Sequence, residues 1–593
     1  MKHINFLLLA CLLVAAVGVF QVPTPVRAAS TITVTTLVDD TTNLNGCSLR
    51  EAITNANNDA VTFPDCIAGS GTDTIVFTSG LNGPILLTSN LPSLSDTDGL
   101  SINGGVNKIT INGNNLYSIF DIPAAVTVTL QNLTITNGLG NGGIIYNAGT
   151  LNLQSSTLTG GSGTLGGAVY NTTTGTANIT NSTFSLNTAL FGGAIFNDIG
   201  TVNVTNSTIL DNSISGGGTG VVYNNGIMTV KNTIVADGNG AALCAGNAFN
   251  AASTNNLADD LTCGPSFTLW TLGQLALGPL QNNGGSTSTF ALLPASVAIN
   301  AGNNSGCPSV DQRGTGRPQG TLCDAGSFEA KISLSVSPTS WTFGSSVVGA
   351  TSLPKTVTIT NTGEANLFIG LITVTGEFSI VNDLCSFTVV APAATCTFGV
   401  VFIPVGTGAK SGIVSIPSNI LASPTTIAVS GTGVTGTNLI LNPGFEYPYK
   451  RPIGWKNPFP PYTLDSIVDR FTGFNSCCSV RLPGKNRLLY VYQGVASAGK
   501  AGNRFLISLS SMADNITIVN PGDVYMGQLI FQDSANRPTD IFTFTFTPGT
   551  HGWEHLQYLV ATTKNNYNFV FRISVKSSTG VAWFDNAVVI RLP

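Results

Sequence analysis

The chain has 593 residues, of which 42 % are apolar and only 9 % are charged, and its formal net charge is -5. So large an apolar fraction excludes a disordered chain, and the scarcity of Glu, Lys and Arg argues against a helical bundle or coiled coil. The small negative charge gives no reason to expect nucleic acid as a partner. Glycine is frequent, with 67 residues, and Ser, Thr and Asn abound, so the composition favours a β-rich protein.

Residues 1–28 have the pattern of a secretory signal peptide. Lys2 precedes an apolar stretch from Phe6 to Phe20, and small residues at Val26 and Ala28 predict cleavage after Ala28. The alternative is a membrane anchor, but the apolar stretch is short for a span and prolines follow it. We therefore expect a secreted or extracellular protein, held at the cell surface or free, with no membrane span after cleavage.

Removal of Cys11 with the signal peptide leaves ten cysteines, an even number that suits an oxidising compartment. Eight of them form near neighbours in the sequence and predict four disulfides: Cys47–Cys66, Cys244–Cys263, Cys307–Cys323 and Cys385–Cys396. The adjacent residues Cys477 and Cys478 are left open, because a vicinal disulfide is strained. No group of Cys and His has the spacing of a zinc site.

A Gly-Gly doublet recurs every 24 to 26 residues between Gly142 and Gly218. Each doublet is followed by an apolar-aromatic-Asn triplet, a short alternating strand and a segment ending in Ser-Thr and an apolar residue. Because Gly and Asn tolerate positive φ, each period holds three short strands separated by sharp turns, which predicts one turn of a parallel β-helix. The Asn of each triplet predicts a side-chain ladder between turns. An antiparallel β-sandwich with coincidental spacing is the alternative.

A β-helix needs a cap, because an open end exposes apolar surface and unpaired backbone groups. Ser48 and Glu51 have the spacing of a capping box, and Leu49 and Ile53 share one helical face. Residues 47–58 are therefore predicted to form a short amphipathic helix that plugs the first turn.

The segment CSLREAI at Cys47–Ile53 resembles the signature of the CSLREA domain, which begins secreted bacterial proteins with right-handed parallel β-helices. Several segments between 282 and 329, including DQRG at Asp311–Gly314, resemble the C-terminal cap of such proteins. The resemblance covers residues 31–330 and sets the β-helix domain at 29–330. It implies architecture and export but no established reaction.

The regular turns carry few ionisable side chains. Those between residues 125 and 240 are Asp198, Asp211, Asp237 and Lys231. Glycoside hydrolysis needs paired carboxylates and lyase chemistry needs a base with a cation, and the turns hold neither arrangement. We therefore expect no catalytic residues, with a polysaccharide lyase or hydrolase acting on the β-helix as the alternative.

The richest charged cluster lies between Cys307 and Cys323 and just beyond them. It contains Asp311, Arg313, Arg317 and Asp324. We expect this cluster to be a structural salt-bridge network in the cap.

Residues 331–435 change to alternating strands with Pro and Gly at the turns, which predicts an immunoglobulin-like sandwich. VTITNTG at Val357–Gly363, FIP at Phe402–Pro404 and SGTG at Ser430–Gly433 resemble the choice-of-anchor D (ASH-like) family. That resemblance implies a spacer or adhesion module.

Residues 436–593 begin with Asn438–Glu446, followed by Gly454-Trp455, and end with Ala582–Ile590. This start and end resemble the galactose-binding-like jelly roll of carbohydrate-binding modules. By that resemblance Glu446 and Asp585 are candidate ligands of a structural calcium, which would also need backbone carbonyls. A capping or edge hydrogen bond is the alternative role for both carboxylates.

Three of the five Trp and eight of the twelve Tyr lie in this last domain. Sugars stack on aromatic rings, so the candidate glycan contacts are Trp455, Tyr490, Tyr492 and Trp553, with core packing as the alternative for each. The sequence thus predicts an all-β, secreted, non-catalytic protein that binds a polysaccharide or cell-wall glycan through its C-terminal jelly roll. A purely structural surface protein whose last domain binds nothing is a further alternative.

Overall fold

The structure is a computed structural model that describes residues 28–42, 45–236, 242–441, 444–445, 454–458, 468–469, 473, 478–485 and 487–592. The chain divides into two compact units. The first unit ends at Ile332 and includes Gly363–Ala365, and the second holds Ser333–Thr362 and the chain from Asn366 onward.

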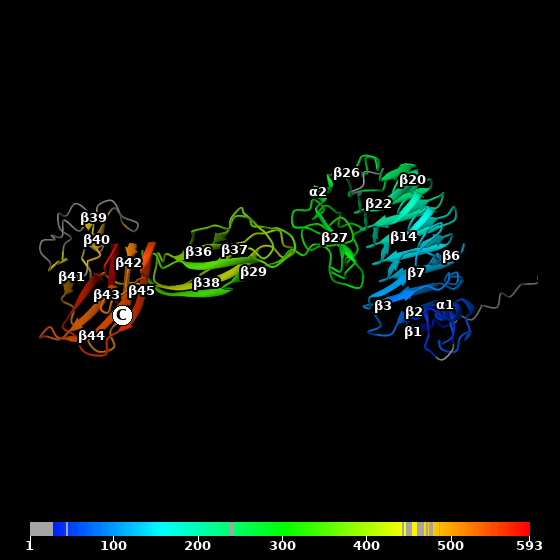
Figure 1. The fold of residues 1–593 in the computed structure, drawn as a ribbon. Coiled ribbons are helices and arrows are strands. Elements are labelled where there is room, and N and C mark those ends of the chain that lie inside the picture. The colour runs from blue at the N-terminus through cyan, green and yellow to red at the C-terminus, as the bar shows by residue number, and fades with distance from the viewer. Residues whose placement is uncertain are drawn as a thin grey trace, which may run out of the picture. The chain divides into compact units, whose positions relative to one another are not determined.

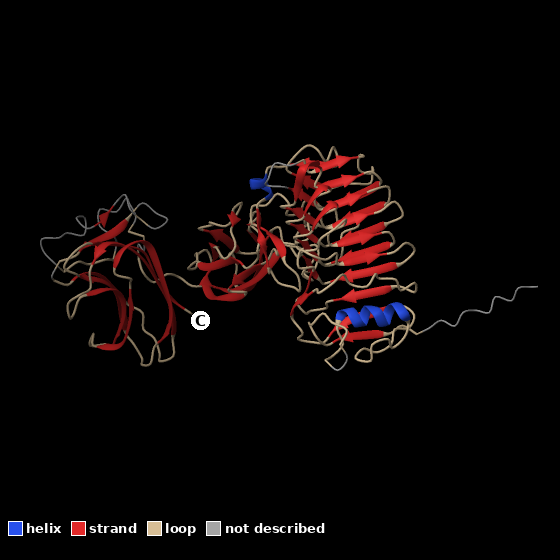
Figure 2. Cartoon of the chain, turned by 45° about the vertical axis from the view of Figure 1, so that its right-hand side comes forward, coloured by secondary structure: helices blue, strands red, loops and turns tan. Residues whose placement is uncertain are grey.

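The first unit is a parallel β-solenoid, as the repeat predicts, and the antiparallel alternative is wrong. Its strands stack as successive turns, and each turn adds one strand to each of several ladders (Figure 1, Figure 2). The first ladder contains β1 (Thr31–Val34), β2 (Asp73–Phe77), β4 (Leu100–Asn103), β7 (Thr127–Gln131), β10 (Thr150–Gln154), β14 (Thr176–Thr180), β18 (Thr201–Thr205) and β22 (Ile227–Lys231).

Three further parallel ladders complete the turns. The second contains β3 (Gly83–Leu86), β5 (Ile109–Asn112), β8 (Thr134–Thr136), β11 (Thr157–Thr159), β15 (Thr183–Ser185), β19 (Thr208–Leu210), β23 (Ile234–Ala236), β25 (Asn256–Ala258) and β26 (Phe267–Leu269). The third contains β6 (Phe120–Ile122), β9 (Ile145–Asn147), β13 (Val169–Asn171), β17 (Ile195–Asn197), β21 (Val222–Asn224) and β24 (Cys244–Gly246). The fourth contains β12 (Ser162–Leu165), β16 (Thr188–Phe191) and β20 (Ser213–Thr219).

The register between turns explains why the repeat length is so regular. Leu151 pairs with Ala177, and Ala177 pairs with Val202, so one apolar position stacks above the same position of the next turn. These side chains are fully buried in the solenoid core. An insertion of one residue in a strand would turn this column outward, because successive side chains of a strand point to opposite faces.

The predicted Asn ladder is confirmed on the third ladder of strands. Asn147 donates to Asn171 at 2.7 Å, Asn171 donates to Asn197 at 2.9 Å, and Asn197 donates to Asn224 at 2.9 Å. All four side chains are buried. The amide oxygens of Asn171, Asn197 and Asn224 are thus paired, which removes the penalty of burying them, whereas the Oδ1 of Asn147 at the start of the ladder is buried with no partner among the described residues.

The predicted capping helix is α1 (Leu49–Asn58), which lies at the N-terminal end of the stack (Figure 2). Glu51 N donates to Ser48 Oγ at 3.2 Å and Ser48 N donates to Glu51 Oε2 at 2.9 Å, so the capping box is present. Leu49 and Ile53 are fully buried in the solenoid core. A segment with α2 (Leu272–Leu275) and the antiparallel pair β27 (Leu277–Gln281) and β28 (Thr289–Leu292) follows the last turns.

The second unit begins with the predicted sandwich. One sheet contains β29 (Leu334–Ser337), β31 (Lys355–Asn361), β36 (Thr395–Phe402) and β34 (Phe378–Val381). The other contains β30 (Ser340–Val347), β38 (Thr425–Val434), β37 (Gly408–Ile416) and β33 (Thr373–Val374). A short pair, β32 (Leu367–Phe368) and β35 (Val389–Val390), lies beside them in the chain.

Two larger antiparallel sheets form the jelly roll that ends the second unit. The five-stranded sheet contains β39 (Val468–Asp469), β40 (Ser479–Pro483), β47 (Val581–Arg591), β42 (Arg504–Ile516) and β45 (Gly549–Ala561). The four-stranded sheet contains β41 (Leu489–Val495), β46 (Asn568–Lys576), β43 (Val524–Gln532) and β44 (Pro538–Thr545). Phenylalanines from both sheets, including Phe505, Phe531 and Phe584, form one buried cluster.

The four predicted disulfides, Cys47–Cys66, Cys244–Cys263, Cys307–Cys323 and Cys385–Cys396, are all present. Cys477 lies outside the described residues, as do residues 1–27 of the predicted signal peptide. In the described part of the chain, no helix combines the length and apolar character needed to cross a membrane.

Candidate functional site

The four-stranded sheet of the jelly roll has one face in the core and one face turned away from it. Val491, Phe571, Leu529 and Phe544 belong to the buried cluster, one from each strand. Because side chains alternate along a strand, the residues next to them point to the opposite face. This opposite face carries the aromatic and polar side chains described below.

Strand pairing lines up four of these side chains in one row across the sheet. Tyr492 lies opposite Arg572, Arg572 lies opposite Gln528, and Gln528 lies opposite Thr543. Lys456 extends the row, since its backbone exchanges hydrogen bonds with Tyr492 at 2.8 and 3.0 Å. We call these five residues the cross-sheet row.

Hydrogen bonds and ring contacts fix the side chains of the row. Arg572 Nη2 donates to Gln528 Oε1, and Gln528 Nε2 donates to Thr543 Oγ1 at 3.0 Å. The guanidinium carbon of Arg572 lies 5.3 Å from the ring centroid of Tyr490, within the range of a cation–π contact. The rings of Tyr490 and Tyr492 are 6.0 Å apart between centroids and inclined by 47°. The result is an aromatic pair beside an ordered chain of donors and acceptors.

Three polar atoms on β46 are inaccessible to solvent and have no hydrogen-bond partner in the described structure. They are the Oδ1 of Asn568, the Nε of Arg572 and the Oγ of Ser574. Ser574 lies between Tyr490 and Met526 in the register, which explains why so small a side chain is covered. Buried polar groups are normally paired, so unpaired polar atoms beneath this face are unusual.

The four aromatic residues singled out from the sequence separate in the structure. Tyr490 and Tyr492 lie together on the outward face, both half-buried. Trp455 is only 4 % exposed and packs on Phe445 and Phe571, with ring centroids 4.9 and 6.2 Å away. Trp553 lies on β45 of the other sheet and is half-buried. The structure therefore brings two of the four onto one face and places Trp455 in the core.

Sequence reasoning missed Arg572 and Gln528, the central members of the row. The strand Asn568–Lys576 alternates apolar and polar residues, and this signal shows that Arg572 points away from the core. It does not show which strands flank it. Only the pairing of β46 with both β41 and β43 brings Arg572 between Tyr492 and Gln528.

The structure describes one of the two candidate calcium ligands. Asp585 is fully buried, and its Oδ1 accepts a hydrogen bond from Asn586 N at 2.6 Å. Glu446 lies outside the described residues. Within the part of the chain that the structure covers, no group of three or more His, Cys, Asp or Glu side chains is suited to a metal. The calcium site therefore stays a prediction.

The five-stranded sheet contains a buried serine–histidine pair. Ser510 Oγ and His555 Nδ1 are 2.7 Å apart, and the register places Asp585 opposite Ser510 on the other side. The order across the sheet is thus Asp, Ser, His, whereas a hydrolytic triad needs the imidazole between the other two. We interpret the pair as part of the packing of this sheet.

Burial gives His555 a pH-dependent role in stability, because it lowers the pKa of the imidazole from 6.5 to about 4. Between these two pKa values the imidazole is protonated in the unfolded chain but neutral in the folded chain. The free energy of unfolding is therefore highest above pH 6.5 and falls as the pH drops toward 4. We expect a loss of about 2 kcal/mol between pH 7 and pH 5 from this group. Denaturant unfolding at the two pH values should show the loss in the wild type and in His551→Gln. The loss should disappear in His555→Gln, and an unchanged slope in that variant would contradict the assignment.

The charged cluster of the first unit forms ion pairs inside its C-terminal cap. Arg317 Nη1 lies 2.8 Å from Glu329 Oε2, and both side chains are fully buried. Arg313 pairs with Asp311 at 2.9 Å. Asp324 accepts hydrogen bonds from the backbone N–H groups of Asn300 and Ala330. Every one of these carboxylates is thus occupied by protein groups of the cap.

The two acids of the regular turns that the structure describes, Asp198 and Asp211, do not converge. Asp198 follows β17 in the third ladder, whereas Asp211 follows β19 in the second. Asp198 accepts a hydrogen bond from Thr173 at 3.0 Å. Asp237 lies outside the described residues. Asp198 and Asp211 therefore do not form the close pair of carboxylates that glycoside hydrolysis uses.

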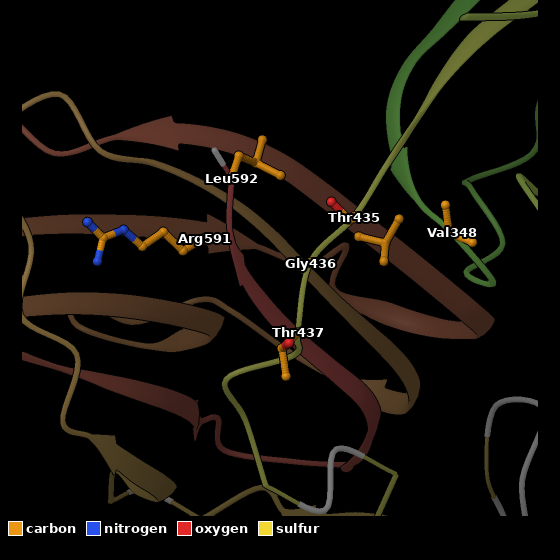
Figure 3. A pocket seen from close by; sticks show the side chains of 7 residues that line it. Val348, Thr435, Gly436, Thr437, Arg591 and Leu592 are labelled. Atoms are coloured by element: carbon orange, nitrogen blue, oxygen red, sulfur yellow. The ribbon is translucent and has the colours of Figure 1, made fainter. Parts of the chain in front are cut away.

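A hollow of about 670 Å³ lies within the second unit around the segment 435–437 (Figure 3). Its charged lining residue is Arg591, whose side chain points away from Val348 in this view. The Arg591 guanidinium donates to the backbone oxygen of Ala498 at 3.0 Å. The hollow offers mainly hydroxyl and apolar groups, so it adds no candidate chemistry.

No family model matches the chain, and no curated protein is similar to it. The Family 16 Carbohydrate Binding Module-2 is 19 % identical over 26 % of this chain and 99 % of its own, with a TM-score of 0.19. The ASH/PapD-like domain of human CEP192 is 14 % identical over 18 % of this chain and 87 % of its own, with a TM-score of 0.14. The enzymatically active domain of tailspike protein 4 of bacteriophage CBA120 is 10 % identical over 88 % of this chain and 55 % of its own, with a TM-score of 0.15.

The chain also spans 50 % of the length of the secreted serine protease VesC from Vibrio cholerae. Likenesses this distant carry no argument about function, which has to come from the residues themselves. The resemblances to the CSLREA and choice-of-anchor D families stay expectations from the sequence.

Proposed function

We propose that this protein is a secreted, non-catalytic extracellular or cell-surface protein that binds a glycan through the cross-sheet row of its jelly roll. The observation that carries the proposal is the alignment of Tyr492, Arg572, Gln528 and Thr543 on one face. A sugar presents a weakly polar ring face and a rim of hydroxyls. The tyrosine pair supplies rings for stacking, and the other members supply hydrogen-bond donors and acceptors.

The dimensions of the row fit a short oligosaccharide. Neighbouring strands lie about 4.8 Å apart, so the four strands place the row over a length of about 14 Å. The side chains stand on paired strands rather than on loops, and the hydrogen bonds from Arg572 to Gln528 and onward to Thr543 hold them in place. A preorganised row of this kind reduces the ordering cost of binding.

Three features support the extracellular, non-catalytic part of the proposal. The sequence begins with the pattern of a signal peptide, and the structure contains four disulfides of the kind that persist in oxidising compartments. In the described solenoid, the buried carboxylates of the cap are engaged by cap residues, and Asp198 and Asp211 lie on different ladders. The solenoid and the sandwich would then serve as structural parts that carry the binding module.

A glycan array with the full-length protein tests the proposal. Tyr492→Ala should weaken binding to the recognised glycan about tenfold or more, because it removes a stacking ring from the cross-sheet row. Tyr567→Ala is the matched control, since Tyr567 is 61 % exposed in the same domain and lies outside the row. Equal binding by both variants and the wild type would contradict the proposal. Failure of the wild type to bind any glycan would favour the purely structural alternative.

A further inference from the structure

We infer that the glycan recognised by the cross-sheet row is anionic, and that Arg572 binds its carboxylate or sulfate group. This inference rests on the proposed function and adds the chemical class of the ligand. It follows from the surroundings of one guanidinium group.

Arg572 is held in place without a counter-charge. Its Nη2 donates to the neutral side chain of Gln528, and its plane lies near the ring of Tyr490. Its Nε is buried and has no hydrogen-bond partner, and no ion pair joins Arg572 to an acid among the residues the structure describes. Removing a guanidinium partly from water without a carboxylate costs free energy that a bound anion would recover.

Among the described residues of the four strands, the register places no Asp or Glu on the outward face. The outward residues of β41, β46, β43 and β44 lie opposite one another, as Tyr490, Ser574, Met526 and Thr545 do in the row beside Arg572. The charged side chains at these positions are Arg572 and Lys576, of which Lys576 lies near Asp523 just before β43, and Lys456 adjoins the row.

The geometry of Arg572 suits a planar or tetrahedral oxyanion. A guanidinium presents its N–H groups in a rigid fork that matches the oxygens of a carboxylate or sulfate. Gln528 engages Nη2 and Nε is covered, so Nη1, which is not one of the covered atoms, is the N–H group left to meet a ligand at the surface.

The distribution of charge along the chain also favours an anionic glycan. Residues 436–593 contain fourteen basic and nine acidic residues, whereas residues 29–330 contain five basic and seventeen acidic residues. The net positive charge of the last domain therefore attracts an anionic polymer, whereas the net negative charge of the solenoid repels it. The attraction should weaken with salt, since exposed charges are screened over about 8 Å at physiological ionic strength.

Paired ligands that differ only in charge test the inference on the full-length protein. The probes are oligosaccharides of galacturonate, glucuronate and mannuronate, each measured beside its own methyl ester, together with sulfated and unsulfated dextran. At least one acidic member should bind ten times or more tightly than its neutral partner. The uronate and sulfate arms show which oxyanion the site prefers.

Variants of Arg572 then locate the effect. Arg572→Gln should abolish the preference for the acidic partner, whereas Arg572→Lys should keep part of it, because Lys retains the charge but not the fork. Lys564→Gln is the matched control, since it removes one exposed positive charge away from the row. Circular dichroism and melting curves check that each variant is folded.

The outcomes separate the two proposals. If neutral partners bind as tightly as acidic ones, or if Arg572→Gln keeps the acidic preference, the inference is overturned while glycan binding stands. If no acidic or neutral probe and no array glycan binds, the proposed function fails with it.

Discussion

Replacing Asn171 with alanine is expected to destabilise the solenoid by about 3–5 kcal/mol, because several buried hydrogen bonds end on this side chain. Asn171 Nδ2 donates to Asn197 Oδ1 at 2.9 Å and to the backbone oxygen of Gly175 at 3.0 Å. Its Oδ1 accepts from Asn147 at 2.7 Å. Alanine leaves these groups buried without their partner and opens a void between two turns.

The outer Asn ladder provides the control. Asn178 exchanges single hydrogen bonds with Asn152 and Asn203, each at 3.0 Å, and is half-buried on the outside of the first ladder. Asn178→Ala should cost below about 1.5 kcal/mol, since water can replace its partners. Hydrogen exchange read on peptides from residues 145–231 measures both variants, because a repeat architecture opens turn by turn. Equal losses in the two variants would contradict the role given to the inner ladder.

The second large effect is expected in the cap, where Arg317→Met should cost about 3–5 kcal/mol. The substitution leaves the fully buried carboxylate of Glu329 without its cation. It also removes hydrogen bonds to the backbone oxygens of Asp324 and Gly326, at 2.9 and 2.8 Å. The double variant Arg317→Met with Glu329→Gln should recover part of the loss, because the remaining side chain carries no charge.

An exposed ion pair serves as the control for the effect of burial on the free energy of unfolding. Arg537 and Asp533 are 2.8 Å apart, but the arginine side chain is 79 % exposed. Arg537→Ala should change the free energy of unfolding by about 1 kcal/mol or less. Denaturant unfolding of the three variants and the wild type measures these differences. A loss in Arg317→Met no larger than in Arg537→Ala would show that the cap does not depend on this pair.

The sequence could predict every feature that depends on spacing along the chain. The period of 24 to 26 residues predicts the solenoid, because equal turn lengths are required for apolar columns to stack. The spacing of Ser48 and Glu51 predicts the capping box, and short separations between cysteines predict the four disulfides. In each case the partners are near one another in sequence or are related by the repeat.

The face of the jelly roll could be predicted only in fragments. The alternation of apolar and polar residues along each strand indicates that Tyr490, Tyr492 and Arg572 point away from the core. It does not separate Trp455 from the tyrosines, and all three aromatic residues were candidate glycan contacts. Trp455 is buried because Phe445 and Phe571, far apart in the chain, close around it. Which strands flank β46 depends on long-range antiparallel pairing, and no local pattern encodes it. Spacing along the chain thus determined the solenoid and its cap, whereas tertiary pairing alone decided that Arg572 lies beside two tyrosines and Gln528.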